Sequence, residues 1–181
     1  MHAPVSAAHR LAVALVLLLL VSAAPLVPAA AGAGARTTTI WSDTVVLQDG
    51  YTVESGDVLV VQSGTTIQLG DDETITVDGR LTIQGTTTSP VLLESIMGNH
   101  DGIVFNSTSD GLGSKLENLT ITDAEYGVTV YGSDPILNDL TVINADNVAV
   151  DLFSSASPRI NDLVIDGGGQ DVHAFSTTWR Y

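Results

Sequence analysis

The chain has 181 residues, and its 21 acidic residues outnumber 6 lysines and arginines, which gives a formal net charge of −15 at pH 7. Nucleic acids and anionic membrane surfaces are poor partners for a protein of this charge. The chain contains no cysteine, so disulfides and thiolate metal sites are excluded. Its stability must therefore come from backbone hydrogen bonding and apolar packing.

Residues 1–35 have the pattern of a secretory signal peptide. Arg10 precedes an apolar run over residues 11–21, and small residues and two prolines follow. We expect cleavage after Ala31 or Ala35. An uncleaved membrane anchor is the alternative, because the apolar region almost reaches the length of a membrane span. No second apolar stretch has that length, so we expect a secreted or cell-surface protein whose mature chain has no membrane span.

From residue 44 to residue 94, short apolar and β-branched runs alternate with turns rich in Gly and Asp. Within the runs, apolar and polar residues alternate, which is typical of strands with one buried face. Asp49-Gly50 and Asp78-Gly79 are turn sequences that also close antiparallel hairpins, so a β-sandwich is an alternative. The expected strands span residues 44–47, 51–53, 58–61, 65–69, 74–77, 80–83 and 91–94.

One phrase recurs three times between residues 115 and 175. Its central leucines are Leu119, Leu140 and Leu163, so the period is 21 (140 − 119) and then 23 (163 − 140). A period of this length built from short strands corresponds to one rung of a parallel β-solenoid. We therefore predict an all-β fold, a parallel β-helix of four to five rungs over residues 36–181.

The segments GDVLV at residues 56–60, GTTI at 64–67 and ITVDGRL at 75–81 resemble the opening of secreted right-handed parallel β-helix proteins, the pectin-lyase-like group. Residues 116–124 and 135–145 resemble that group's rungs. The resemblance covers nearly all of the mature chain and implies a right-handed helix. It is specific for the fold and not for an activity, because the group includes lyases, hydrolases, epimerases, adhesins and surface-layer proteins.

The resemblance does not carry catalytic residues into this chain. Lyases of the group have a Ca²⁺ site of acidic residues with a catalytic Arg or Lys, and no such motif is present. Hydrolases of the group use Asp clusters, whereas the only adjacent aspartates here, Asp71 and Asp72, lie in a Gly-bounded turn without a nearby His. We assign no catalytic residue and favour a non-enzymatic protein.

Stacking the three copies aligns polar residues in columns. Glu117, Asn138 and Asn161 form one column, where we expect a ladder of amide hydrogen bonds. The other two columns are acidic and contain Asn118, Asp139 and Asp162, and Asp123, Asn144 and Asp166. Carboxylates at this spacing repel one another unless they are solvated or share a cation, and Ca²⁺ prefers oxygen ligands. Asp123, Asp139, Asp162 and Asp166 are therefore candidate Ca²⁺ ligands, with solvated turns as the alternative; no other cofactor is expected.

Asn106 and Asn118 begin N-x-Ser/Thr patterns and are candidate glycosylation sites. After Phe175 only a short segment follows, with Trp179 and Tyr181 available to plug the last rung. Because a solenoid needs a cap at its open end, we expect either such a plug or a chain truncated before further C-terminal rungs or domains.

Together these observations predict an exported or cell-surface β-helix module with a structural, adhesive or glycan-binding role. The expected partner is an extracellular polysaccharide or glycan, because flat polar strand faces suit an extended chain. The alternative is a polysaccharide lyase or glycoside hydrolase of the pectin-lyase-like group, or a fragment of one.

Overall fold

The structure is a computed structural model that describes residues 36–109 and 111–175. These residues form β-strands and one turn of 3-10 helix, Ser107–Ser109. The predicted signal peptide, residues 1–35, lies outside the described residues, as do Trp179 and Tyr181. Within the described part, no helix is long and apolar enough to cross a membrane.

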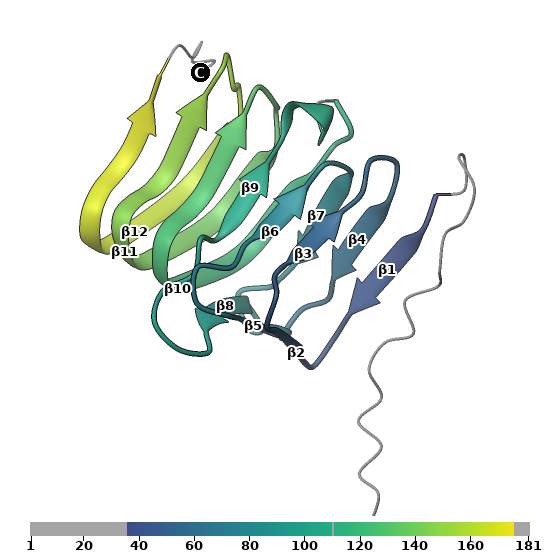
Figure 1. Ribbon diagram of the computed structural model, residues 1–181, viewed down its shortest axis with the longest axis horizontal. Helices are drawn as coiled ribbons and strands as arrows, with labels where there is room; N and C mark the ends of the chain where they lie inside the picture. Colours follow the sequence, from purple (N-terminus) through teal and green to yellow (C-terminus); the bar gives the residue numbers. More distant parts are fainter. Residues whose placement is uncertain (1–35, 110, 176–181) are drawn as a thin grey trace, which may run out of the picture. The chain divides into compact units, whose positions relative to one another are not determined.

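The strands follow one another as the turns of a coil, which we call rungs (Figure 1). Each of the first three rungs contains three short strands, and each of the last three is a single long strand that bends through the whole turn. Rung 1 comprises β1 (Thr38–Trp41), β2 (Thr44–Leu47) and β3 (Tyr51–Val53); rung 2, β4 (Val58–Val61), β5 (Thr66–Leu69) and β6 (Ile75–Val77); rung 3, β7 (Arg80–Gln84), β8 (Val91–Ser95) and β9 (Ile103–Phe105); and rungs 4, 5 and 6 are β10 (Lys115–Tyr131), β11 (Ile136–Phe153) and β12 (Arg159–Ala174).

Successive rungs pair side by side and build three sheet faces. Face A contains β1, β4, β7 and the first part of β10, β11 and β12. Face B contains β2, β5, β8 and the middle part of the long strands. Face C contains β3, β6, β9 and the last part of the long strands. The predicted all-β, right-handed parallel β-helix is confirmed.

Two details of the prediction are wrong. All ladders between named strands are parallel, which excludes the β-sandwich, and Asp49-Gly50 and Asp78-Gly79 connect neighbouring faces instead of closing hairpins. The described solenoid also has about six rungs, where four to five were predicted. The reason is that the A–B and B–C corners of rungs 4 to 6 lie within single long strands, so that each long strand supplies all three faces of a rung.

Those tight corners use residues with left-handed backbone conformation. At the corner between faces A and B, Asn118, Asp139 and Asp162 have φ values of 45°, 49° and 56°. Asn and Asp adopt this conformation more readily than other side chains because their short polar groups bond to the local backbone. The backbone therefore bends sharply at these residues, where a strand would otherwise continue straight.

Inward-facing apolar side chains line up from rung to rung and form the core. On face B, Ile67, Leu93, Ile121 and Val142 lie in register and are fully buried. Burial of each such side chain stabilises the fold by roughly 1.5–3 kcal/mol. In rung 6 the matching residue, Ile165, is only partly buried.

Candidate functional site

A groove of about 210 Å³ opens on the outside of the solenoid at the corner between faces A and B. Its floor is a column of outward side chains on face B, Thr120, Thr141 and Val164, which lie in register on rungs 4, 5 and 6. One wall is the corner column of Asn118, Asp139 and Asp162, and the loop residues Thr86, Thr87 and Pro90 form the end at rung 3.

The groove exists because neighbouring rungs turn this corner differently. Rung 3 needs the loop of residues 85–90, whereas rungs 4 to 6 turn at one residue each. Within the loop, Thr86 and Ser89 exchange two backbone hydrogen bonds of 3.1 Å. Gly85 lets the loop approach rung 4, since a Cβ there would collide with the backbone oxygens of Glu117 and Asn118.

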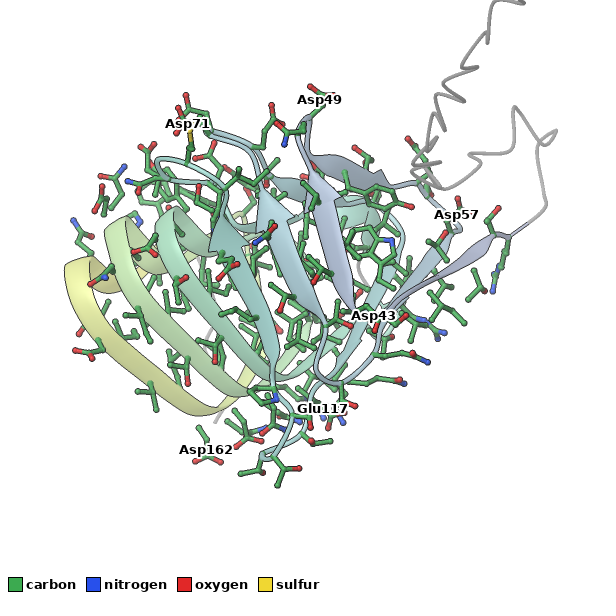
Figure 2. The ribbon with its side chains drawn as sticks, turned by 90° about the horizontal axis from the view of Figure 1, so that it is seen from below. Asp43, Asp49, Asp57, Asp71, Glu117 and Asp162 are labelled. Atoms are coloured by element: carbon green, nitrogen blue, oxygen red, sulfur yellow. The ribbon has the colours of Figure 1, made fainter. Side chains whose placement is uncertain are left out.

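The two carboxylates of the groove have no hydrogen-bond or ion-pair partner among the described residues. Asp139 and Asp162 are exposed, and they occupy the same corner on adjacent rungs, about 4.8 Å apart along the solenoid axis. Asn118, by contrast, donates from Nδ2 to the Gly85 carbonyl over 3.3 Å. Figure 2 shows Asp162 and Glu117 on this side of the molecule, away from Asp49 and Asp71.

Face A, next to the groove, carries the lysine and arginine side chains of the described strands. Arg80, Lys115 and Arg159 all lie at outward positions on this face. Lys115 is already paired, because its Nζ lies 2.5 Å from a carboxylate oxygen of Glu117.

The predicted amide ladder is present in part: Asn161 donates from Nδ2 to the Asn138 side-chain oxygen over 2.7 Å.

The predicted Ca²⁺ ligands fall at two different corners. Asp139 and Asp162 lie together on the groove wall. Asp123 lies at the corner between faces B and C, where Asn144 donates to its carboxylate over 3.4 Å. The predicted alignment of Asp166 with Asn144 is wrong. Asp166 is in register with Ile143, and Gly167 (φ = 73°) occupies the corner position that matches Asn144. No described group of three or more acidic or His side chains has metal-site geometry.

Several acidic side chains lie at the corner between faces B and C, and two of them accept hydrogen bonds from asparagine side-chain amides. Asn99 donates to Asp146 over 2.5 Å, and Asn147 donates to Glu125 over 2.6 Å. Burial raises the pKa of Asp101, and the nearby carboxylates of Glu125, Asp72 and Glu73 raise it further. The adjacent aspartates Asp71 and Asp72 belong to this corner and not to the groove.

His100 is fully buried at the same corner. Its Nδ1 accepts a hydrogen bond of 2.9 Å from the Gly102 amide, and its Nε2 lies 3.2 Å from the Thr122 carbonyl oxygen. Since that oxygen only accepts, we assign the proton to Nε2, and both ring nitrogens are satisfied in the neutral ring. Burial lowers the pKa of His100, although the Thr122 carbonyl and the charge of Asp123 act in the opposite direction. His100 is thus a structural residue.

On the outside of face C, Asp151 and His173 form a pair that sequence reasoning missed. The His173 Nδ1 lies 2.8 Å from an Asp151 carboxylate oxygen, and Asp151 is only 5% exposed. A carboxylate at Nδ1 leaves Nε2 free for proton transfer. The hydroxyl in the same column belongs to Thr129 on rung 4. Asp151, on rung 5, lies between Thr129 and His173, so the hydroxyl is not next to the His173 ring. We therefore assign the pair no catalytic role.

Aromatic rings beside this pair are stacked on each other. Tyr131 and Phe153 have centroids 5.0 Å apart and planes within 13° of parallel. Phe153 also contacts the His173 ring edge-on, with centroids 6.0 Å apart. Because the Tyr131 and Phe153 rings cover each other's faces, a sugar lying along face C would meet their edges, so this aromatic stack is a poor platform for a sugar ring.

The two candidate glycosylation asparagines both donate hydrogen bonds within the fold. Asn106 donates from Nδ2 to Asp78 over 3.0 Å, and Thr108, from the same sequence pattern, donates to the same carboxylate oxygen over 2.6 Å. Asn118 forms the groove wall and bonds Gly85. Glycosylation at either residue stays a prediction.

Comparison with known proteins adds no identity to this geometry. No protein-family model matches the sequence, and no curated protein matches it. The function must therefore be argued from the residues of the groove.

Proposed function

We propose that the protein is an exported or cell-surface β-helix module that binds an extended glycan in the groove between faces A and B. One observation carries the proposal: the groove wall has a polar amide or carboxylate side chain on each of rungs 4, 5 and 6, and the floor has a hydroxyl on rungs 4 and 5. The floor presents the hydroxyls of Thr120 and Thr141, and the wall presents Asn118, Asp139 and Asp162.

The repeat supports a polymeric ligand instead of a compact one. Equivalent groups recur at about 4.8 Å, the spacing of neighbouring strands, which is close to the rise of one sugar residue in an extended chain. Hydroxyl and carboxylate groups are the partners that sugar hydroxyls need, and strand-mounted side chains hold them in fixed positions. The loop of residues 85–90 borders the groove at rung 3.

A role in binding is favoured over the lyase or hydrolase alternative. The groove is lined by Thr, Asn, Asp, Pro and Val side chains, and no Lys, Arg or His is among its described lining residues. Lyases of the pectin-lyase-like group use a catalytic Arg or Lys, and the only acidic residues of the lining, Asp139 and Asp162, are both exposed to solvent. We therefore propose binding without cleavage.

The direct test is a binding screen against neutral, cationic and anionic oligosaccharides, with product analysis on the same samples. Thr141→Arg fills the middle of the groove floor and should abolish binding. Thr52→Arg is the matched control, because it adds the same side chain at an exposed position in β3 on face C. New reducing or unsaturated ends in the products would contradict a purely binding role.

A second proposal concerns Ca²⁺, and it is favoured by the carboxylates of Asp139 and Asp162, which have no partner among the described residues. A cation between them would relieve their repulsion and bind only the folded chain, which stabilises it by mass action. We expect Ca²⁺ to raise the unfolding midpoint of the protein relative to a chelator, and the Asp139→Asn/Asp162→Asn variant to lose this rise. An unchanged midpoint in wild-type protein would exclude the site.

A further inference from the structure

The groove is not only polar but negative, and this property identifies a class of glycan. The inference below rests on the proposed glycan binding. Asp139 and Asp162 lie on adjacent rungs with no hydrogen-bond or ion-pair partner in the described part of the chain, so both carboxylates remain available to a ligand. Among residues 36–109 and 111–175, no cationic side chain lines the groove to offset them.

The nearest basic residues of the strands do not change the sign of the groove. Lys115 and Arg159 share one outward column of face A, on the other side of the corner, and Arg80 lies further along that face. The charge of Lys115 is already balanced by Glu117 at 2.5 Å. An anionic sugar chain in the groove would therefore meet two carboxylates and no compensating cation from the described residues. Polyuronates are disfavoured for this reason.

We infer that the groove selects an amine-bearing glycan, an extended chain of amino sugars whose free ammonium groups pair with Asp139 and Asp162. The hydroxyls of Thr120 and Thr141 on the floor are then left for the sugar hydroxyls. Because the two carboxylates lie about one rung spacing apart, a single bound chain can offer ammonium groups to both.

The size of the preference follows from the exposure of the carboxylates. An exposed ammonium–carboxylate pair changes an equilibrium by roughly 1.4- to 5-fold, so two pairs give roughly 2- to 25-fold. Such pairs are also screened by salt, and the preference should shrink as the ionic strength rises.

The experiment titrates three size-matched oligosaccharides into the purified protein: a hexamer of glucosamine with free amines, its fully N-acetylated counterpart and a hexamer of galacturonate. Titrations are made by calorimetry with chelator and again with Ca²⁺, at a pH at which the sugar amines are protonated, and circular dichroism checks folding. We expect the free-amine hexamer to bind roughly 2- to 25-fold more tightly than the N-acetylated one. Asp139→Asn/Asp162→Asn should remove this difference, and Ca²⁺ should compete.

The matched control is Asp49→Asn/Glu54→Gln, which changes the net charge equally at two exposed positions in rung 1. It should leave the preference intact; loss of the preference in this control would indicate general charge attraction and overturn the inference. Equal binding of amine and N-acetyl forms, abolished by Thr141→Arg, would overturn the inference and retain the proposed function. Preference for the galacturonate hexamer would overturn the inference in the same way. Failure of all three hexamers to bind would overturn both.

Discussion

Rungs 1 to 3 and rungs 4 to 6 build the same three sheet faces from strands of different length. In the first half, each face is a separate strand of three to five residues, joined by loops such as residues 85–90 and 96–102. In the second half, β10, β11 and β12 run for 17, 18 and 16 residues and turn within the strand at Asn, Asp or Gly residues with left-handed backbone conformation. Both halves keep the same inward column of buried apolar residues.

Both halves share the inward core columns and the parallel ladder register, whereas the length of the corners differs from rung to rung. The groove lies where the two halves meet. Its end comes from the loop of rung 3, and its wall and floor come from the tight corners and strands of rungs 4 to 6. Surface features thus arise from differences between neighbouring corners, without any change in the core.

The largest expected effect tests whether the core is the same in both halves. Leu93→Ala in rung 3 and Leu140→Ala in rung 5 each remove a fully buried side chain and should each cost about 2–5 kcal/mol in the free energy of unfolding. Leu163→Ala, in the column of Leu140 but only partly buried, should cost about 1–2 kcal/mol. Denaturant unfolding measures all three. An equal loss at Leu163 would contradict the partial burial of this side chain.

The next effect is a pH dependence of the folding stability, caused by His100 in the loop of residues 96–102 in rung 3. The pKa of His100 is lowered in the folded protein, so below the unfolded value of 6.5 the unfolded chain binds a proton that the folded chain refuses. Stability should therefore fall as the pH drops below about 6.5, with a slope of at most about 1.4 kcal/mol per pH unit.

His100→Gln should remove that slope, whatever its effect on overall stability. Unfolding midpoints between pH 7.5 and roughly pH 5.5 make the comparison. Asp101 acts with the opposite sign, because its raised pKa favours the protonated form in the folded state. A slope that persists in His100→Gln would show that other groups cause the acid sensitivity.

A smaller effect tests the tight corners of the second half. Asn144 has φ = 56° at the corner between faces B and C. Asn144→Val should destabilise the fold by about 1–2 kcal/mol, because a β-branched side chain is strained there. Asn144→Gly should stay within about 0.5 kcal/mol of wild type, since Gly adopts this conformation without strain. Equal losses would mean that the side-chain bond to Asp123, and not the backbone, determines the residue at this corner.

The smallest effect concerns the amide pair between rungs 5 and 6. Asn161→Ala removes the 2.7 Å bond to Asn138 and should cost about 0.5–1 kcal/mol, because the pair is exposed. Gln84→Ala is the control, since Gln84 lies in the same column of rung 3 without a side-chain hydrogen bond among the described residues. Thermal unfolding of the two variants should differ by only a few degrees.

Much of the fold could be predicted because the repeat is direct. The spacing of Leu119, Leu140 and Leu163 predicts the register that β10, β11 and β12 adopt. The error at Asp166 arose from aligning residues by chemical type; the offset between Leu140 and Leu163 places Gly167 at the corner, and Gly satisfies the left-handed backbone as well as Asn does.

The groove could not be predicted in the same way. It depends on β7 pairing with β10, where Thr82 lies opposite Lys115, outside the regular period of the repeat. Without that pairing, Thr86 and Asn118 have no reason to be neighbours. The pairing of Asp151 with His173, by contrast, could have been predicted from the sequence. The two residues lie one period apart in matching segments of the repeat, and they are opposite in charge when the His is protonated.

The parallel ladders also determine the sequence separation between a residue and its ladder partner. Thr38 pairs with Val58, in the very next rung, and even the widest ladder joins Thr82 only to Lys115, again one rung later. A chain that emerges from a narrow channel, N-terminus first, can therefore complete each rung soon after the next one appears. No described strand has to remain unpaired until a distant part of the chain arrives, and folding can keep pace with emergence.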